Sequence, residues 1–142
     1  MAYTAKLLIC DVASVRADQT VAEAAAYMAK ANIGSVLVGS MAKPEGIFTE
    51  RDICRRVVAK GLDAAKTPIS AVMTKTLVTV EASAPLDQVF SKLADGRFRH
   101  LPITEGGKVV GIVSITDLAK VLQEVYREDK YLQYFADVVQ AR

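Results

Sequence analysis

The stretch GIFTERDI at residues 46–53 returns in altered form as GIVSITDL at residues 111–118. Each stretch has a glycine, two apolar residues, a threonine or serine and, three positions later, an aspartate. Gly46 and Gly111 lie 65 positions apart, and Asp52 and Asp117 are separated by the same distance along the chain. This agreement in spacing indicates that the chain contains an internal repeat.

The same offset extends well beyond the two stretches. It places Ser14-Val15 on Thr79-Val80 and Lys43 on Lys108. One ungapped offset over about fifty positions is the signature of a duplicated structural unit. We predict one copy over residues 7–62, a second copy over residues 70–122 and a helical tail over residues 123–142.

Both copies show the same succession of local patterns: an extended piece, a helix, two strands of a hairpin and a second helix. Polar steps at residues 17–20 and 82–85 suit helix starts. The first helices show apolar residues at helical spacing, which are Val21, Ala24, Ala25, Met28 and Ala29 in one copy and Leu86, Val89, Phe90 and Leu93 in the other. The extended pieces are 13–15 and 77–80, and the hairpins pair 35–38 with 46–48 and 101–103 with 109–113. Gly106-Gly107 is a good turn signal in the second hairpin.

The order β-α-β-β-α in duplicate predicts an α/β fold with two small sheets. Each copy is too small to bury its apolar faces alone, so we expect the two copies to pack together. In the tail, Leu118, Val125, Leu132 and Val139 recur every seven residues. This stripe predicts a helix over 118–139 that packs either on its own core or against a second copy of the chain.

Composition narrows the function classes. The 142 residues include 18 basic and 16 acidic side chains, and the net charge of +2 disfavours general nucleic-acid binding. Neither a signal peptide nor a membrane helix is expected, and the two cysteines, Cys10 and Cys54, are interpreted as small core residues in a cytoplasmic protein. No nucleophile–base pair and no metal cluster is visible in the sequence, so an enzyme is not expected.

The duplicated Gly-apolar-x-Thr/Ser-x-x-Asp motif resembles that of the cystathionine-β-synthase-type (CBS) domain pair, or Bateman module, and the resemblance covers residues 7–122. The segment GRFRHLP at residues 96–102 also resembles the second repeat of small bacterial stand-alone CBS proteins. The resemblance implies two CBS repeats packed around a pseudo-twofold axis. It also implies a homodimer that binds an adenosine ligand (AMP, ADP, ATP, S-adenosylmethionine or NAD(H)) between the repeats and signals to an effector protein, without a catalytic cofactor. A structural adaptor with no physiological ligand is the alternative.

Two pairs of residues are candidates for contact with the ribose. Thr49 with Asp52, and Ser114 with Asp117, match the family positions that hold the ribose hydroxyls. A carboxylate can accept hydrogen bonds from two adjacent hydroxyls, and such charge-assisted bonds are strong. The same spacing is also that of a capping box, in which the hydroxyl and the carboxylate satisfy backbone N–H groups at a helix start. The two roles are compatible for the hydroxyl.

Four basic residues are candidates for contact with phosphate: Arg97, Arg99, His100 and Arg55. Arginine suits this role because its planar guanidinium bonds two oxygens at once. The alternative is that these side chains form a solvated strand edge and, for Arg51, Arg55 and Arg56, a solvated helix face. Phe48 and Phe98 are expected in the core, with stacking on a nucleotide base as the alternative.

The repeats are not equivalent at the candidate phosphate positions. The offset places Arg99 on Gly34 and His100 on Ser35, so the first copy lacks these charges. The resemblance implies that the aspartate of one repeat works with basic residues of the other. We therefore expect the stronger site to combine Thr49 and Asp52 with Arg99 and His100, and the site at Ser114 and Asp117 to lack the expected cations.

Overall fold

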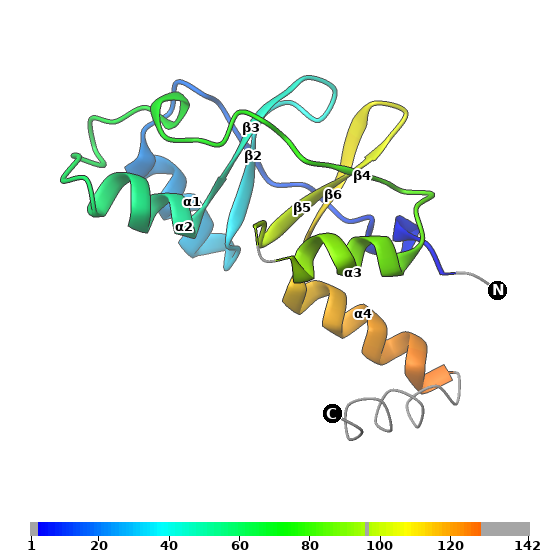
Figure 1. The fold of residues 1–142 in the computed structure, drawn as a ribbon. Coiled ribbons are helices and arrows are strands. Elements are labelled where there is room, and N and C mark those ends of the chain that lie inside the picture. The colour runs from blue at the N-terminus through cyan, green and yellow to red at the C-terminus, as the bar shows by residue number, and fades with distance from the viewer. Residues whose placement is uncertain (1–2, 96, 129–142) are drawn as a thin grey trace.

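A computed structural model of the chain describes residues 3–95 and 97–128. It contains two similar α/β halves, each with a three-stranded sheet and helices packed beside it (Figure 1). The duplicated β-α-β-β-α order predicted from the sequence is confirmed.

The first half begins with the short strand β1 and ends in a helix with an unusual final part. Its elements are β1 (Ser14–Val15), α1 (Val21–Ala31), β2 (Ser35–Gly39), β3 (Pro44–Thr49) and α2 (Glu50–Asp52), which continues as a π-helix over Ile53–Val58. Thr20 caps α1, since its side chain accepts from the backbone N–H of Glu23 while the Glu23 side chain accepts from that of Thr20.

The second half repeats this order with a longer final helix. Its elements are β4 (Val80–Glu81), α3 (Leu86–Ala94), β5 (His100–Glu105), β6 (Lys108–Ser114) and α4 (Ile115–Glu128). Pro85 stands at the N-cap of α3, where it provides no side-chain cap. The turn at Gly106-Gly107 is confirmed, because both glycines have positive φ and join the paired strands β5 and β6.

The two sheets have the same topology and the same irregularity. In each, the first strand is parallel to the second, and the second is antiparallel to the third. The register shifts between Val38 and Gly39 in one sheet and between Ile103 and Thr104 in the other, which are positions 65 apart. The duplication therefore extends to the detail of the hairpin bulge.

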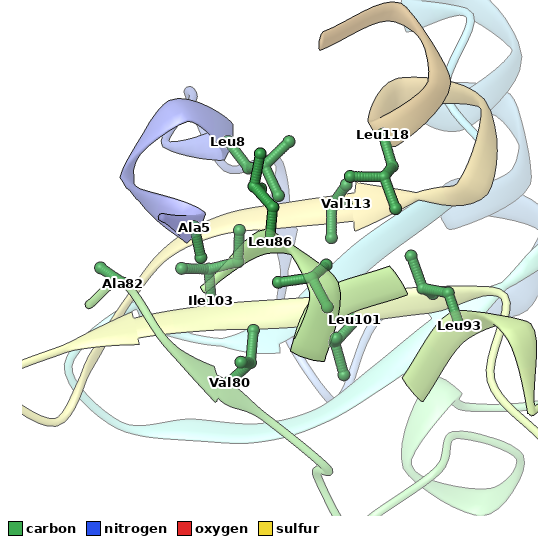
Figure 2. Close-up of a cluster of buried hydrophobic side chains, with 11 residues drawn as sticks. Ala5, Leu8, Val80, Ala82, Leu86, Leu93, Leu101, Ile103, Val113 and Leu118 are labelled. Atoms are coloured by element: carbon green, nitrogen blue, oxygen red, sulfur yellow. The ribbon is translucent and has the colours of Figure 1, made fainter. Parts of the chain in front are cut away.

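Each half receives part of its core from the segment that precedes the other half. The 3-10 helix Ala5–Leu8 precedes the first half, yet Ala5 and Leu8 pack with Val80, Leu101 and Ile103 in the core of the second half (Figure 2). Conversely, the 3-10 helix Ile69–Ala71, which precedes the second half, places Ile69 in the core of the first half. We call these two pieces, residues 3–10 and 67–74, the exchanged segments.

Two glycines at equivalent positions allow the exchanged segments to approach the sheets. A Cβ added to Gly46 would lie 2.6 Å from the backbone oxygen of Thr74, and one added to Gly111 would lie 2.7 Å from that of Leu8. Backbone hydrogen bonds stabilise both contacts. Ile47 and Thr74 form two hydrogen bonds with each other, and the Cys10 N–H donates to the Val110 carbonyl. Glycine at these positions is required by the close approach of another backbone.

Several sequence expectations were wrong in detail. Cys10 and Cys54 are exposed, because Cys10 lies in the connection after Ala5–Leu8 and Cys54 on the outer side of the π-helix. Phe90 and Ala29 are also exposed, so the buried helix faces are narrower than the apolar pattern indicated. Phe48 is in the core as predicted.

The helical tail is confirmed as far as Glu128, and the rest of the predicted stripe, including Leu132 and Val139, lies outside the described residues. Within the described ranges, the helices are too short or too polar to cross a membrane.

Candidate functional site

A cleft of about 540 Å³ lies where the end of β3 and the following helix meet the start of β5. We call it the arginine cleft. It brings together the candidate residues of both repeats: Thr49, Asp52 and Arg55 from the first, and Arg97, Arg99 and His100 from the second. Arg51, Arg56, Glu50, Cys54 and Phe98 also line it. The pairing of one repeat's aspartate with the other repeat's basic residues thus matches the arrangement expected from the sequence.

Asp52 is buried and largely satisfied by its own repeat. Its Oδ2 accepts from the Thr49 backbone N–H at 2.9 Å and from the Thr49 hydroxyl at 3.3 Å, while its Oδ1 lies 3.4 Å from Arg56 Nε. The Asp52 backbone N–H in turn donates to Thr49 Oγ1. The capping box weighed as an alternative is therefore present. A carboxylate has about four acceptor positions, so a further hydrogen bond to a ligand hydroxyl remains available.

Arg56 serves the fold as well as the cleft. Besides pairing with Asp52, its Nη1 donates to the carbonyls of Val72 and Met73, at 3.2 Å and 3.0 Å. These carbonyls belong to an exchanged segment. Arg56 thus ties the capping aspartate of the first repeat to the segment that leads into the second, a link that the sequence pattern did not indicate.

The other arginines leave the cleft strongly positive. Partial burial lowers the pKa of Arg51, and the positive charges of Arg99 and Arg55 lower it further, against an opposing effect of Asp52. Arg51, Arg55 and Arg99 line the same cleft, and their charges act on one another. Arg55 lies on the π-helix, and π-turns in helices occur frequently at functional sites.

Arg97 and Phe98 occupy the edge of the cleft. Arg97 lies 3.5 Å from Asp95, and both side chains are mostly exposed, so this pair is weak and an anion could compete for Arg97. Phe98 is only half-buried and lines the cleft, so its expected place in the core was wrong.

His100 lies at the boundary of two clefts, because it also lines the second one described below. Its Nδ1 is buried and has no hydrogen-bond partner among the described residues. Burial lowers the pKa of His100, and Arg99 adds to this, whereas Asp117, Glu50 and Asp52 oppose it. The Nε2 would lie 3.3 Å from a Cβ at Gly34, so a side chain there would press on the imidazole.

The second cleft, of about 610 Å³, is related to the first by the repeat. We call it the acidic cleft. Ser114 and Asp117 form the equivalent capping box: Asp117 Oδ2 accepts from the Ser114 backbone N–H at 3.0 Å and from its hydroxyl at 2.8 Å. Unlike Asp52, Asp117 is exposed. The charged side chains that line this cleft are Asp11, Asp117, Glu124 and Lys120.

Equivalent positions of the two clefts differ mainly in charge. Arg51, Arg56, Arg97 and Arg99 of the arginine cleft stand 65 positions from Thr116, Val121, Asn32 and Gly34, which line the acidic cleft. Only Arg55 has a cationic counterpart, Lys120. The sequence indicated that the first repeat has Gly34 where the second has the cation Arg99. It did not indicate that Asp11 and Glu124 would line this cleft, because neither belongs to the repeated motif.

Among the described residues, no group of three or more His, Cys, Asp or Glu side chains is arranged to hold a metal ion.

Comparison with known protein families identifies the family to which this fold belongs. The family model described as the CBS domain matches residues 5–59 and again residues 69–124. The chain belongs to the CBS-domain family. CBS-domain proteins are generally regulatory, nucleotide-binding modules, and no catalytic family is indicated.

Individual CBS relatives support the assignment. The CBS domain-containing protein YhcV of Bacillus subtilis is 38% identical over 108 residues, which are 76% of this chain and 76% of that protein. CBSCBSPB5 of Arabidopsis thaliana is 37% identical over 84% of this chain, which spans only 21% of that longer protein. The crystal structure of a hexameric CBS-CP12 protein from bloom-forming cyanobacteria superposes with a TM-score of 0.76 at 29% identity, covering 84% of this chain and 67% of that one. Oligomers therefore occur among the structural neighbours.

Proposed function

We propose that this CBS pair is a regulatory module that binds an adenine nucleotide (AMP, ADP, ATP or NAD(H)) between its repeats and transmits the ligand state to an effector protein. One observation carries this proposal. Thr49 and Asp52 of the first repeat line the arginine cleft together with Arg97, Arg99 and His100 of the second. Residues suited to a ribose and residues suited to a phosphate therefore line the same cavity.

The unbalanced charge of the arginine cleft supports binding of the phosphate part of the ligand. Five arginines line it against the carboxylates of Glu50 and Asp52. Burial lowers the pKa of Arg51, and the nearby charges of Arg99 and Arg55 lower it further, which is consistent with a cluster of cations that favours an anion. Guanidinium groups bond phosphate oxygens in pairs, so Arg55, Arg97 and Arg99 suit a phosphate chain.

The capping boxes support binding of the ribose part of the ligand. Both aspartates are held in fixed orientation by their own helix starts, so little side-chain entropy is lost when a ribose hydroxyl donates to them. Thr49 and Ser114 stand at the same helix starts and can bond the ligand as well. Capping and ribose binding are compatible functions of one motif.

Signalling requires that the nucleotide prefers one of two conformations. Because the arginine cleft is built from both repeats, a ligand there acts on the angle between them. We propose that the chain forms a homodimer, as the family resemblance implies, and that an effector protein responds to this change of angle.

The test uses nucleotide-free protein and a panel of AMP, ADP, ATP, NAD, NADH and S-adenosylmethionine. A ligand at about 100 times its Kd adds about 2.7 kcal/mol to the stability of the folded state, which is visible as a rise in Tm. Calorimetric titration then compares Arg99→Ala with Arg16→Ala. Arg16 is the matched control because its side chain is exposed, pairs with Asp18 and lies outside both clefts.

The proposal predicts a Tm rise with at least one phosphorylated ligand, weakened by Arg99→Ala and unchanged by Arg16→Ala. Protein that shows no shift with any member of the panel would instead be a structural adaptor. The Asp52→Asn variant, which retains an acceptor for the Thr49 N–H, tests the ribose contact with less damage to the fold than Asp52→Ala.

A further inference from the structure

The two clefts of this chain have opposite charge. The arginine cleft carries five arginines against two carboxylates, whereas the acidic cleft carries Asp11, Asp117 and Glu124 against Lys120 among the described residues. His100 lines both clefts, and its lowered pKa leaves it neutral at pH 7. The charge difference therefore comes from fixed side chains and not from the shared histidine.

A phosphate chain is poorly matched to the acidic cleft. The positions that are arginines in the other cleft are here occupied by Asn32, Gly34, Thr116 and Val121. Each added phosphate would bring negative charge toward three carboxylates, and like charges repel one another. Polyphosphate nucleotides should therefore be rejected.

A nucleoside is well matched to the same cleft. Asp117 Oδ2 is engaged by Ser114, which leaves Oδ1 of this exposed carboxylate to accept from adjacent ribose hydroxyls. Leu8, Val12 and Ile112 give an apolar wall. Residues 11 and 12 also line the cleft and lie outside helix and strand, so their backbone groups can bond the edge of a base.

We propose that the acidic cleft binds a nucleoside that lacks a phosphate chain and carries a neutral or positively charged substituent, while the arginine cleft takes the phosphorylated ligand. This inference rests on the proposed function, which it extends by assigning a different ligand class to each cleft. Asp11 and Glu124 are the residues that select the charge of the substituent.

The chain provides its own reporter for each cleft. Cys10 is exposed and lines the acidic cleft, and Cys54 is exposed and lines the arginine cleft. The variants Cys10→Ser and Cys54→Ser each leave one thiol, and the rate of its alkylation by N-ethylmaleimide measures occupancy of one cleft. S-adenosylmethionine, a sulfonium cation, should slow alkylation of Cys10 several-fold and leave Cys54 unchanged. ATP should slow alkylation of Cys54 and leave Cys10 unchanged.

A second measurement separates the effect of the ligand's charge from the effect of its shape. S-adenosylhomocysteine has the nucleoside and amino-acid parts of S-adenosylmethionine but no sulfonium charge. Calorimetric titration should give an affinity about fivefold to tenfold higher for the sulfonium, as expected for one ion pair near the surface. The double variant Asp11→Asn, Glu124→Gln should remove this preference. Glu45→Gln, an exposed carboxylate outside both clefts, should retain it.

The outcomes separate this inference from the proposed function. Equal protection of Cys10 and Cys54 by ATP, or an unchanged sulfonium preference in the double variant, overturns the assignment of ligand classes and leaves nucleotide binding intact. Protection of neither thiol by any of the three probes overturns both.

Discussion

The two repeats surround their clefts with similar backbone structure but differ in the charge of the side chains that line them. The capping boxes at Thr49–Asp52 and Ser114–Asp117, the hairpin bulges and the close glycine contacts all recur at one offset. By contrast, four arginines of one cleft have uncharged counterparts in the other. The features that recur are those that packing and backbone geometry require, whereas the arginines that do not recur line one cleft.

One more difference separates the helices that follow the capping boxes. In the first repeat, residues Ile53–Val58 form a π-helix, in which the Ala59 N–H donates to the Cys54 carbonyl. In the second repeat the corresponding turns belong to the α-helix α4. The wider π turn changes the directions in which Arg55 and Arg56 project. The divergence between the clefts therefore involves the backbone as well as the side chains.

The largest expected effect tests whether the two repeats are equivalent as folds. Gly46→Ala and Gly111→Ala each place a methyl group within 2.7 Å of a backbone oxygen of an exchanged segment. Overpacking of this kind costs about 3 kcal/mol, and urea unfolding should show a similar loss for both variants. A near-neutral Gly111→Ala would show that residues 3–10 contribute little to the second core.

The next prediction compares equivalent cations in the two clefts. Arg55→Ala should weaken ATP binding about tenfold, because a charge-assisted hydrogen bond contributes about 1.5 kcal/mol. Lys120→Ala, at the equivalent position, should leave ATP binding unchanged. Isothermal titration calorimetry measures both, and an equal loss in the two variants would contradict the division of the clefts by charge.

A smaller effect concerns the first helix of each repeat. Thr20→Ala removes the capping box of α1 and should cost about 1 kcal/mol of unfolding free energy. Pro85→Thr introduces a cap at the equivalent position, with Gln88 in place to complete a capping box. It should stabilise by a few tenths of a kcal/mol, since the loss of proline rigidity offsets part of the gain. A destabilised Pro85→Thr would indicate that proline is needed for the contact with Thr4.

The smallest effect is a pH dependence from the single histidine. Burial lowers the pKa of His100 in the folded chain, so the unfolded chain binds more protons near its ordinary value of 6.5. Stability should therefore be fully present above pH 6.5 and fall as the pH drops through the lowered pKa of the folded state. Urea unfolding between about pH 5 and 7.5 should show this slope in the wild type and a flatter one in His100→Gln. Identical slopes would mean that another group is responsible.

The repeat, the hairpins and the pairing of Thr49 and Asp52 with Arg99 and His100 could be predicted because they follow from local patterns and one offset. The exchanged segments could not be predicted, since Ala5 and Leu8 reach their partners through packing between distant parts of the chain. The exposure of Cys10 and Cys54 was missed because an apolar neighbourhood in sequence does not specify the direction of a side chain. The second site at Ser114 and Asp117 was also predicted, but its acidic lining was not, because Asp11 and Glu124 come from elements outside the motif.

The exchanged segments also describe how this chain relates to a shorter one. A solitary repeat would lack the leading segment of its own core and would carry a segment that fits only another copy, which is the geometry of a domain-swapped dimer. The present chain corresponds to such a dimer with its two subunits joined end to end through residues 59–66. Because this connection links the two repeats, their association is intramolecular and occurs at a high effective concentration of one repeat around the other. Cleavage there should turn folding into a concentration-dependent association of two fragments, neither of which forms a complete core alone.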